Sequence, residues 1–364
     1  MMRVVRGTLV PHCGMDWRNL ERFPLASGRW QCLRPPLNRM QDGEVRVAKA
    51  LRQWHPFDPI IVATPESPRF APPICLPEIS NRVHLKTLFQ FRLIIFLLVC
   101  SIALVSGLLL VGIGNTDKLQ RIVGAFGACL LYFSVDYFLV LRHLPLLQER
   151  ALFTNFVYER TRGVLVPLVC LLVVAGFLQL IMQSTIGGFE PLVRRFGLVF
   201  SSAMAGDYWR YAIGPFIHSG PIHWINNLVT LTVVAGIAGV MGKRSVTLHF
   251  LAYVILTAVA VNLLPEEIRP EALVGISGGI FGLWGWVIGA AFRNRNCLPQ
   301  LFFLLMGIFA LLSVGLSLLL VPKASNTAHI SGLILGLVVG AFNIGVQLSF
   351  RAGYSERNGE IKSA

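Results

Sequence analysis

The sequence has little charge, and acidic residues are especially scarce. Only 14% of its 364 residues are charged, and 18 Asp and Glu stand against 32 Lys and Arg. Soluble domains carry about 25% charged residues, so this composition excludes an ordinary soluble enzyme. A disordered chain is excluded too, because it would be poor in apolar residues, whereas this chain is 54% hydrophobic.

Patterns typical of metal, cofactor or nucleic-acid binding are also missing. The seven cysteines are scattered, without a CxxC pair or a spacing typical of zinc ligands. Basic stretches interleaved with aromatic residues, which mark nucleic-acid interfaces, do not occur. We therefore expect no cofactor and no nucleic-acid partner. Residues 1–30 contain no continuous apolar region, so no signal peptide is predicted.

The sequence is instead rich in continuous apolar runs. Runs of about 20 residues can cross a bilayer core of about 30 Å as helices. They predict an all-α polytopic membrane protein that crosses the lipid bilayer eight times. The spans cover residues 93–114, 122–141, 163–183, 221–241, 246–265, 273–292, 298–320 and 328–348.

Composition divides the chain into four parts. Residues 1–91 hold eleven of the twenty prolines and are predicted to form a basic, largely irregular cytoplasmic tail. Residues 92–162 contain two additional transmembrane helices and a cytoplasmic connection. Residues 163–350 contain the six other predicted spans, and residues 351–364 are predicted to form a short cytoplasmic C-terminal tail.

The basic residues predict the orientation. With both termini in the cytoplasm, 25 of the 32 Lys and Arg lie on the inner side, as the positive-inside rule requires. We expect a bacterial inner membrane, although the arginine-rich start leaves a mitochondrial transit peptide open. The oligomeric state is left open.

Four polar residues lie within the predicted spans at a similar depth. They are His223, Asn227, Ser277 and His329. The fourth, sixth and eighth spans all run from outside to inside, and each of these residues lies near the start of its span. Because polar groups are unfavourable in a bilayer, residues of this kind are candidates for a functional site.

Glycines flank two of these residues. Gly278 and Gly282 follow Ser277, and His329 precedes Gly332 and Gly336. Small residues in membrane helices usually serve close helix packing, and an isolated Ser or His there is more often structural. Here, close packing of the two glycine faces would bring His329 to Ser277.

This pairing is chemically meaningful. A serine hydroxyl becomes a good nucleophile when a neutral imidazole accepts its proton. The oxyanion of the tetrahedral intermediate then needs a hydrogen-bond donor, and Asn227, one turn after His223, could provide one. Asp136 lies at the wrong depth for a third member, so a Ser–His dyad is predicted. A zinc site of His218, His223 and His329 is disfavoured, because no acidic residue accompanies them.

These motifs resemble the rhomboid intramembrane serine proteases. The matching stretches are Trp209-Arg210-Tyr211, His218, His223-x-x-x-Asn227, Gly275-Ile276-Ser277-Gly278 and Ala328-His329-x-x-Gly332-x-x-x-Gly336. The resemblance covers about residues 163–350, so it implies a six-helix rhomboid-like core preceded by two extra transmembrane helices.

The resemblance also implies a role for each matching residue. Ser277 would be the nucleophile and His329 the general base, with His223 and Asn227 in the oxyanion hole. His218 and Arg210 would have structural roles near the site, as would the glycines Gly275, Gly278, Gly332 and Gly336. The substrates would be transmembrane proteins, cleaved near their outer ends after lateral access near the fourth and seventh spans.

Two other function classes remain as alternatives. A catalytically silent rhomboid-like protein that binds membrane clients would be expected to lack Ser277 or His329, and both are present. A transporter would show inverted repeats or broken helices around charged residues, and neither is clear.

Overall fold

The structure is a computed structural model. It describes residues 29–34, 39–52, 59–67, 69–80, 127, 132, 135–136, 139, 143–242, 246–320, 326–342 and 344. The predicted C-terminal tail, the span at 93–114 and most of the span at 122–141 lie outside these residues.

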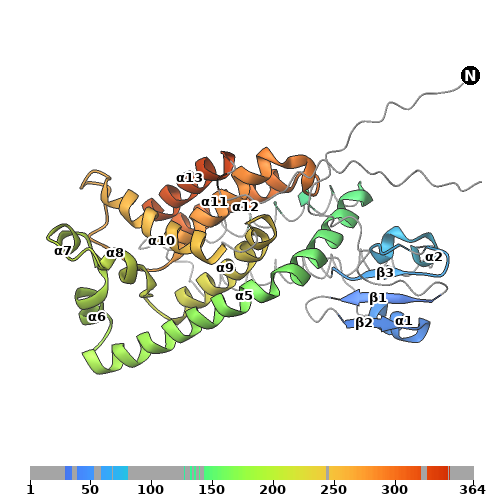
Figure 1. The fold of residues 1–364 in the computed structure, drawn as a ribbon, viewed down its shortest axis with the longest axis horizontal. Helices are drawn as coiled ribbons and strands as arrows, with labels where there is room; N and C mark the ends of the chain where they lie inside the picture. The colour runs from blue at the N-terminus through green and yellow to red at the C-terminus, as the bar shows by residue number, and fades with distance from the viewer. Residues whose placement is uncertain are drawn as a thin grey trace, which may run out of the picture.

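Six helices occupy the places of the six predicted core spans (Figure 1). They are α5 (Leu144–Ile186), α9 (Pro221–Gly242), α10 (Val246–Asn262), α11 (Ser277–Arg293), α12 (Phe302–Leu320) and α13 (Asn326–Ala341). Within the described residues, Leu165–Ile186 and His223–Gly242 are long and apolar enough to cross a membrane. The helices α10, α12 and α13 contain shorter apolar stretches, and the full count of eight spans stays a prediction.

Helix α11 lies at the centre of the bundle. Its residues from Gly278 to Ala291 are all buried, including the large side chains of Trp284 and Trp286. It packs against α9, α10, α12 and α13. Its glycines, among them Gly279 against α10 and Gly285 against α13, let neighbouring helices approach closely on more than one side, which explains this central place.

Short elements connect α5 to α9 at one end of the bundle. They are α6 (Phe189–Phe196), β4 (Leu198–Val199), α7 (Phe200–Met204), α8 (Arg210–Ile213) and the 3-10 helix η2 (Gly214–Phe216). Strand β4 pairs antiparallel with β5 (Ala272–Leu273), which lies just before α11. This pairing fixes the connection to the segment that carries Ser277.

The N-terminal segment differs from the largely irregular tail that the sequence predicts. Its described part contains an antiparallel sheet of order β2-β1-β3 and two helices. The elements are β1 (Gln31–Arg34), β2 (Arg39–Asp42), α1 (Glu44–Arg52), β3 (Ile61–Ala63), the 3-10 helix η1 (Pro73–Cys75) and α2 (Pro77–Ser80). Strands of three or four residues are too short to show a period in the sequence, and burial of their side chains stabilises them.

This N-terminal unit packs against the first half of α5 (Figure 1). Leu33 and Ile61 from the sheet are fully buried and share a core cluster with Phe153 and Phe156 of α5. Helix α5 is continuous across residue 162, where the sequence places a boundary between a connection and the core. The predicted connection is thus the first part of this helix.

Asn155 of α5 should hold the N-terminal unit in place. Its side chain is 1% exposed, and its Nδ2 donates to the carbonyl oxygens of Pro59 (2.7 Å) and Ala151 (2.8 Å). We expect Asn155→Ala to weaken this docking by about 1–3 kcal/mol, because the half-buried carbonyl of Pro59 then loses its donor. Hydrogen exchange should become faster in β3. Thr154→Ala is the matched control, since the Thr154 hydroxyl bonds only within α5; equal effects of both variants would contradict the prediction.

Candidate active site

Glycines bring α11 and α13 into backbone contact. A Cβ atom at Gly332 would collide with the carbonyl oxygen of Gly278, and one at Gly336 would collide with that of Gly282. Farther along, a Cβ at Gly340 would meet the carbonyl oxygen of Trp286. The predicted packing of the two glycine faces is therefore confirmed. Without side chains between them, the two helices can lie close enough for their first turns to interact.

The Ser277 and His329 side chains meet at this contact. His329 Nε2 lies 2.8 Å from Ser277 Oγ, a distance suitable for proton transfer. Both residues lie in the first turn of their helices, at the same end of the bundle. The His329 ring is 7% exposed and stacks on Phe281, with ring centroids 4.6 Å apart. Its Nδ1 has no hydrogen-bond partner within the described residues, so no acidic third member is found there.

His223 and Asn227 flank the backbone just before Ser277. A Cβ at Gly275 would lie 2.6 Å from His223 Cε1 and 3.6 Å from Asn227 Nδ2. Gly275 has a φ of +96°, a conformation that side chains other than glycine rarely adopt. Asn227 is 6% exposed, and its Nδ2 has no partner within the described residues. A buried amide donor beside the dyad can therefore bond a group that enters the site.

The start of α11 leaves further donors free. Its N-cap residue, Ile276, forms no side-chain hydrogen bond to the first turn. The first backbone N–H groups of a helix have no partner inside the helix, and the helix dipole makes this end favourable for negative charge. The backbone around Ser277 therefore suits an oxyanion.

His218 lies behind these residues, in the connection before α9. Its backbone N–H donates to Gln179 Oε1 (2.9 Å), and Gln179 Nε2 donates to its carbonyl oxygen (2.6 Å). Its ring is 5.3 Å from that of His223, whose Nδ1 lies 3.0 Å from Ser219 Oγ. Gln179 thus fixes this connection to α5.

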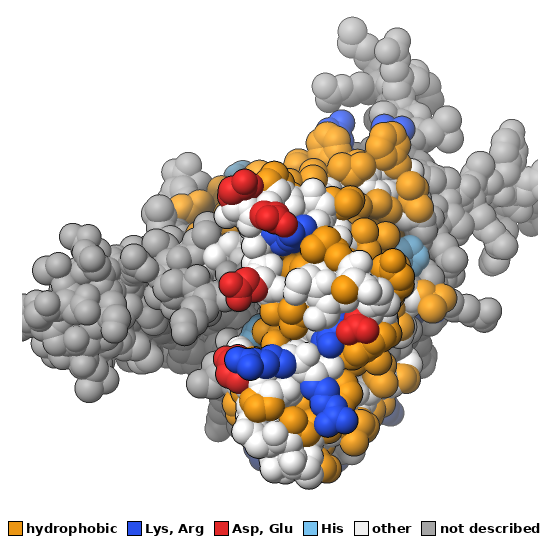
Figure 2. All heavy atoms as spheres, turned by 90° about the vertical axis from the view of Figure 1, so that its left-hand side faces the viewer, with side chains coloured by type: hydrophobic (Ala, Val, Ile, Leu, Met, Phe, Trp, Pro, Cys, Tyr) orange, Lys and Arg blue, Asp and Glu red, His pale blue; other side chains and the backbone are white. Residues whose placement is uncertain are grey.

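Arg210 organises the connection from α5 to α9. It is 6% exposed, its Nε donates to Asp207 (2.9 Å), and its Nη1 donates to the carbonyl oxygens of Gly197 (2.7 Å) and Arg194 (3.3 Å). Its guanidinium group also lies 4.7 Å from the ring centroid of Trp209. Figure 2 shows this end of the molecule, where acidic and basic side chains alternate with apolar ones. A mixed surface of this kind suits a membrane interface.

Comparison with known proteins agrees with this geometry. The Rhomboid domain family matches residues 205–345. Rhomboid protease GlpG of Haemophilus influenzae is 32% identical over 140 residues, which are 37% of this chain and 69% of GlpG. The chain belongs to the rhomboid family.

RHOMBOID-like protein 4 of Arabidopsis thaliana is 28% identical over 147 residues, which are 40% of this chain and 36% of that protein. RHOMBOID-like protein 5 of the same plant is 24% identical over 160 residues, or 43% of this chain and 50% of that protein. The chain thus covers half or less of each plant relative.

The matched rhomboid domain contains all of the predicted site residues. Sequence reasoning missed Gln179, Asp207 and Phe281. Phe281 lies four residues after Ser277, so it shares a helix face with the serine, and this spacing could have revealed it. Asp207 lies three residues before Arg210. Gln179 lies outside the matched region, and no sequence signal links it to His218.

No group of three His, Cys, Asp or Glu side chains suited to a metal ion occurs in the described part of the chain. Two of the three histidines of the disfavoured zinc site, His218 and His223, lie side by side.

The rhomboid domain should lose stability in mild acid through His218. Burial, and secondarily the neighbouring His223, lower the pKa of His218 from 6.5 to about 4, although its hydrogen bond to the Phe216 carbonyl oxygen opposes the shift. Because the folded pKa lies below the unfolded one, the stabilisation is present above pH 6.5 and is lost as the pH falls toward 4. We expect a loss of about 2 kcal/mol between pH 7 and pH 5. Melting curves of the wild type and His218→Gln at both pH values test this; the same pH dependence in both would contradict it.

Proposed function

We propose that this protein is an intramembrane serine endopeptidase. It hydrolyses peptide bonds in or near the transmembrane segments of other membrane proteins, with Ser277 as nucleophile and His329 as general base. The single observation that carries this proposal is the 2.8 Å contact between His329 Nε2 and Ser277 Oγ. Membership of the rhomboid family supports the same activity.

The chemistry follows from the side chains around the dyad. His329 accepts the hydroxyl proton as Ser277 Oγ attacks the peptide carbonyl, and it then returns the proton to the leaving amine. The negative charge on the tetrahedral intermediate is stabilised by Asn227, His223 and the uncapped N-terminus of α11. Phe281 supports the ring of His329 through stacking. Water then releases the acyl group from Ser277 by the reverse sequence.

The site lies at the end of the bundle that we predict to face outward, in a bacterial inner membrane with both termini in the cytoplasm. Transmembrane proteins are therefore the proposed substrates, cleaved near their outer ends. The long connection ordered by Arg210 would exclude lipid from the dyad.

Labelling with a fluorophosphonate probe tests the proposal directly. In native membranes, we expect the probe to modify Ser277 in the wild type, because a serine activated by histidine attacks phosphorus as it attacks a carbonyl. His329→Ala should remove the labelling and Ser313→Ala should not, since Ser313 bonds only to the Phe309 carbonyl within α12.

Cleavage of a reporter transmembrane substrate by the unmodified protein, and loss of this cleavage after labelling of Ser277, complete the test. A folded protein whose Ser277 is not labelled, and which leaves the reporter intact, would contradict the proposal. Retention of intact clients by that protein would then favour a catalytically silent rhomboid-like protein.

A further inference from the structure

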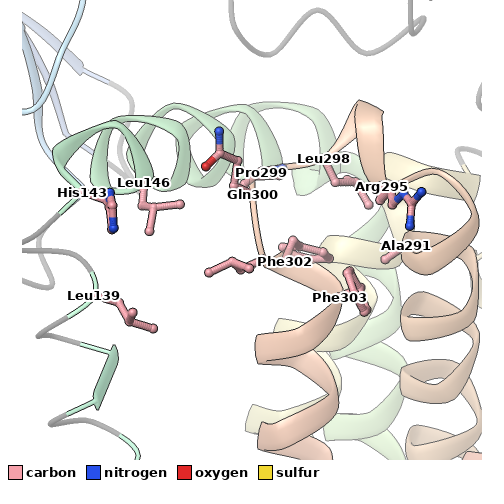
Figure 3. A pocket seen from close by; sticks show the side chains of 11 residues that line it. Leu139, His143, Leu146, Ala291, Arg295, Leu298, Pro299, Gln300, Phe302 and Phe303 are labelled. Carbon is pink, nitrogen blue, oxygen red and sulfur yellow. The ribbon is translucent and has the colours of Figure 1, made fainter.

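A hollow lies at the end of the bundle opposite Ser277. It is a cavity of about 480 Å³ between the start of α5, the end of α11 and the start of α12 (Figure 3). Its lining residues are Leu139, His143, Leu146, Ala291, Arg295, Leu298, Pro299, Gln300, Leu301, Phe302 and Phe303. Cavities of about 300–1,000 Å³ are large enough for small ligands.

The lining combines apolar walls with one cationic side chain, Arg295. Leu146 and Leu298 are 4% and 2% exposed, and Phe302 and Phe303 add aromatic surface. Figure 3 shows His143 on one side of the cavity and Arg295 on the other, with Phe302 and Phe303 between them. Both His143 and Arg295 are exposed to solvent. Such a lining suits a molecule with an apolar part and a negatively charged part.

Within the described residues, Arg295 is unpaired, unlike three other arginines of this structure. Arg150 pairs with Asp136 at 2.8 Å, Arg210 with Asp207 at 2.9 Å and Arg269 with Glu266 at 3.1 Å. Across the described ranges, by contrast, Arg295 forms no ion pair and no side-chain hydrogen bond. Its guanidinium group therefore keeps all of its donors for a ligand.

The loop between α11 and α12 has a fixed shape at this cavity. The backbone N–H of Gln300 donates to Glu149 Oε2 of α5 at 2.8 Å. Leu301 has a φ of +59°, which is unfavourable for a residue with a side chain. The contact with α5 holds the loop in this conformation and keeps the wall of the cavity in place. It also occupies one oxygen of Glu149, an acidic group close to the cavity.

The cavity is placed where a lipid headgroup would lie. Helix α11 has 17 residues, so Ser277 and the cavity are separated by about 24 Å along its axis. The hydrocarbon core of a bilayer is about 30 Å thick. If Ser277 lies just below one surface, the cavity therefore lies near the opposite surface, which the charge distribution predicts to be cytoplasmic.

We propose that this cavity binds a phospholipid with a negatively charged headgroup. The phosphate contacts Arg295, and an acyl chain lies against Leu146, Leu298 and the two phenylalanines. Basic pockets between helices at the cytoplasmic surface are suited to such lipids. The proposal is independent of proteolysis and rests on described residues of α5, of α12 and of the loop between α11 and α12.

Lipid binding to the purified full-length protein tests this proposal. Native mass spectrometry would compare retention of phosphatidylglycerol and phosphatidylcholine from mixed micelles by the wild type, Arg295→Gln and Arg293→Gln. Arg293 is the matched control, because it is also exposed and lies two residues away but does not line the cavity. We expect preferential retention of phosphatidylglycerol, about fivefold weaker in Arg295→Gln and unchanged in Arg293→Gln.

Three results would overturn the proposal. Equal retention of both lipids by the wild type would show that the headgroup charge is not recognised. Equal losses in both arginine variants would indicate general attraction to a basic surface. Displacement of the lipid by soluble glycerol phosphate at an equal concentration would identify a phosphate site without a role for the apolar walls. Because both arginines are exposed, neither variant should unfold, and melting curves check this.

Discussion

Cleavage of a reporter transmembrane substrate should fall by about 10⁴-fold or more in Ser277→Ala, since the remaining site can only bind and polarise the peptide bond. His329→Ala should lower the rate by a similar factor, because Ser277 Oγ then loses the imidazole that lies within hydrogen-bond distance of it. The double variant should be no slower than either single variant. Residues that act as one unit show this non-additivity.

The reporter measurement needs a control that leaves the dyad intact. Ser313→Ala removes another hydroxyl from a membrane helix, and the rate should stay within about twofold of the wild type, as for surface changes away from the site. Melting temperatures of all variants separate loss of chemistry from loss of fold. Cleavage that survives Ser277→Ala in a folded protein would contradict the dyad assignment, and additive losses would show that Ser277 and His329 act separately.

Gly336→Ala should disrupt the packing of α11 against α13. The added Cβ would collide with the backbone carbonyl oxygen of Gly282, which cannot move without moving α11. Overpacking in a rigid core costs about 1–3 kcal/mol or more, so we expect a clear fall in melting temperature. Labelling of Ser277 should fall as well, because His329 lies on the displaced helix.

Another helix provides a matched control for the glycine experiment. Gly315 of α12 has no atom within 4 Å of a Cβ built at its position, so Gly315→Ala adds the same methyl group without a collision. Alanine is also the better helix former. We therefore expect Gly315→Ala to leave stability and labelling unchanged or slightly improved. Equal effects of both variants would show that close approach of α11 and α13 is not required.

The site was largely predictable because its residues carry two independent signals. Polar residues are rare in apolar runs, so His223, Asn227, Ser277 and His329 stand out by type. The glycines after Ser277 and His329 then indicate which two helices approach each other. Depth and helix face together were sufficient to predict the contact between Ser277 and His329.

The contacts that hold the site and the N-terminal unit from outside the sequence motifs could not be predicted. Gln179 holds His218 from a helix 39 residues earlier in the chain, and Asn155 binds the carbonyl of Pro59 across 96 residues. Neither pairing leaves a periodic pattern or a local spacing. The short strands of the N-terminal unit were missed for the same reason, since their burial depends on Phe153 and Phe156 of α5.

The sequence by itself determined the apolar helices of the core, the orientation expected from its basic residues, and the residues able to carry the proposed chemistry. These properties depend on composition and on spacing within single helices. Only the tertiary structure decided that residues 29–80 include a folded unit on α5, that Gln179 and Asp207 support the site, and that Arg295 borders an apolar cavity. Each of these depends on contacts between segments far apart in the chain, and such contacts arise only when the whole bundle packs.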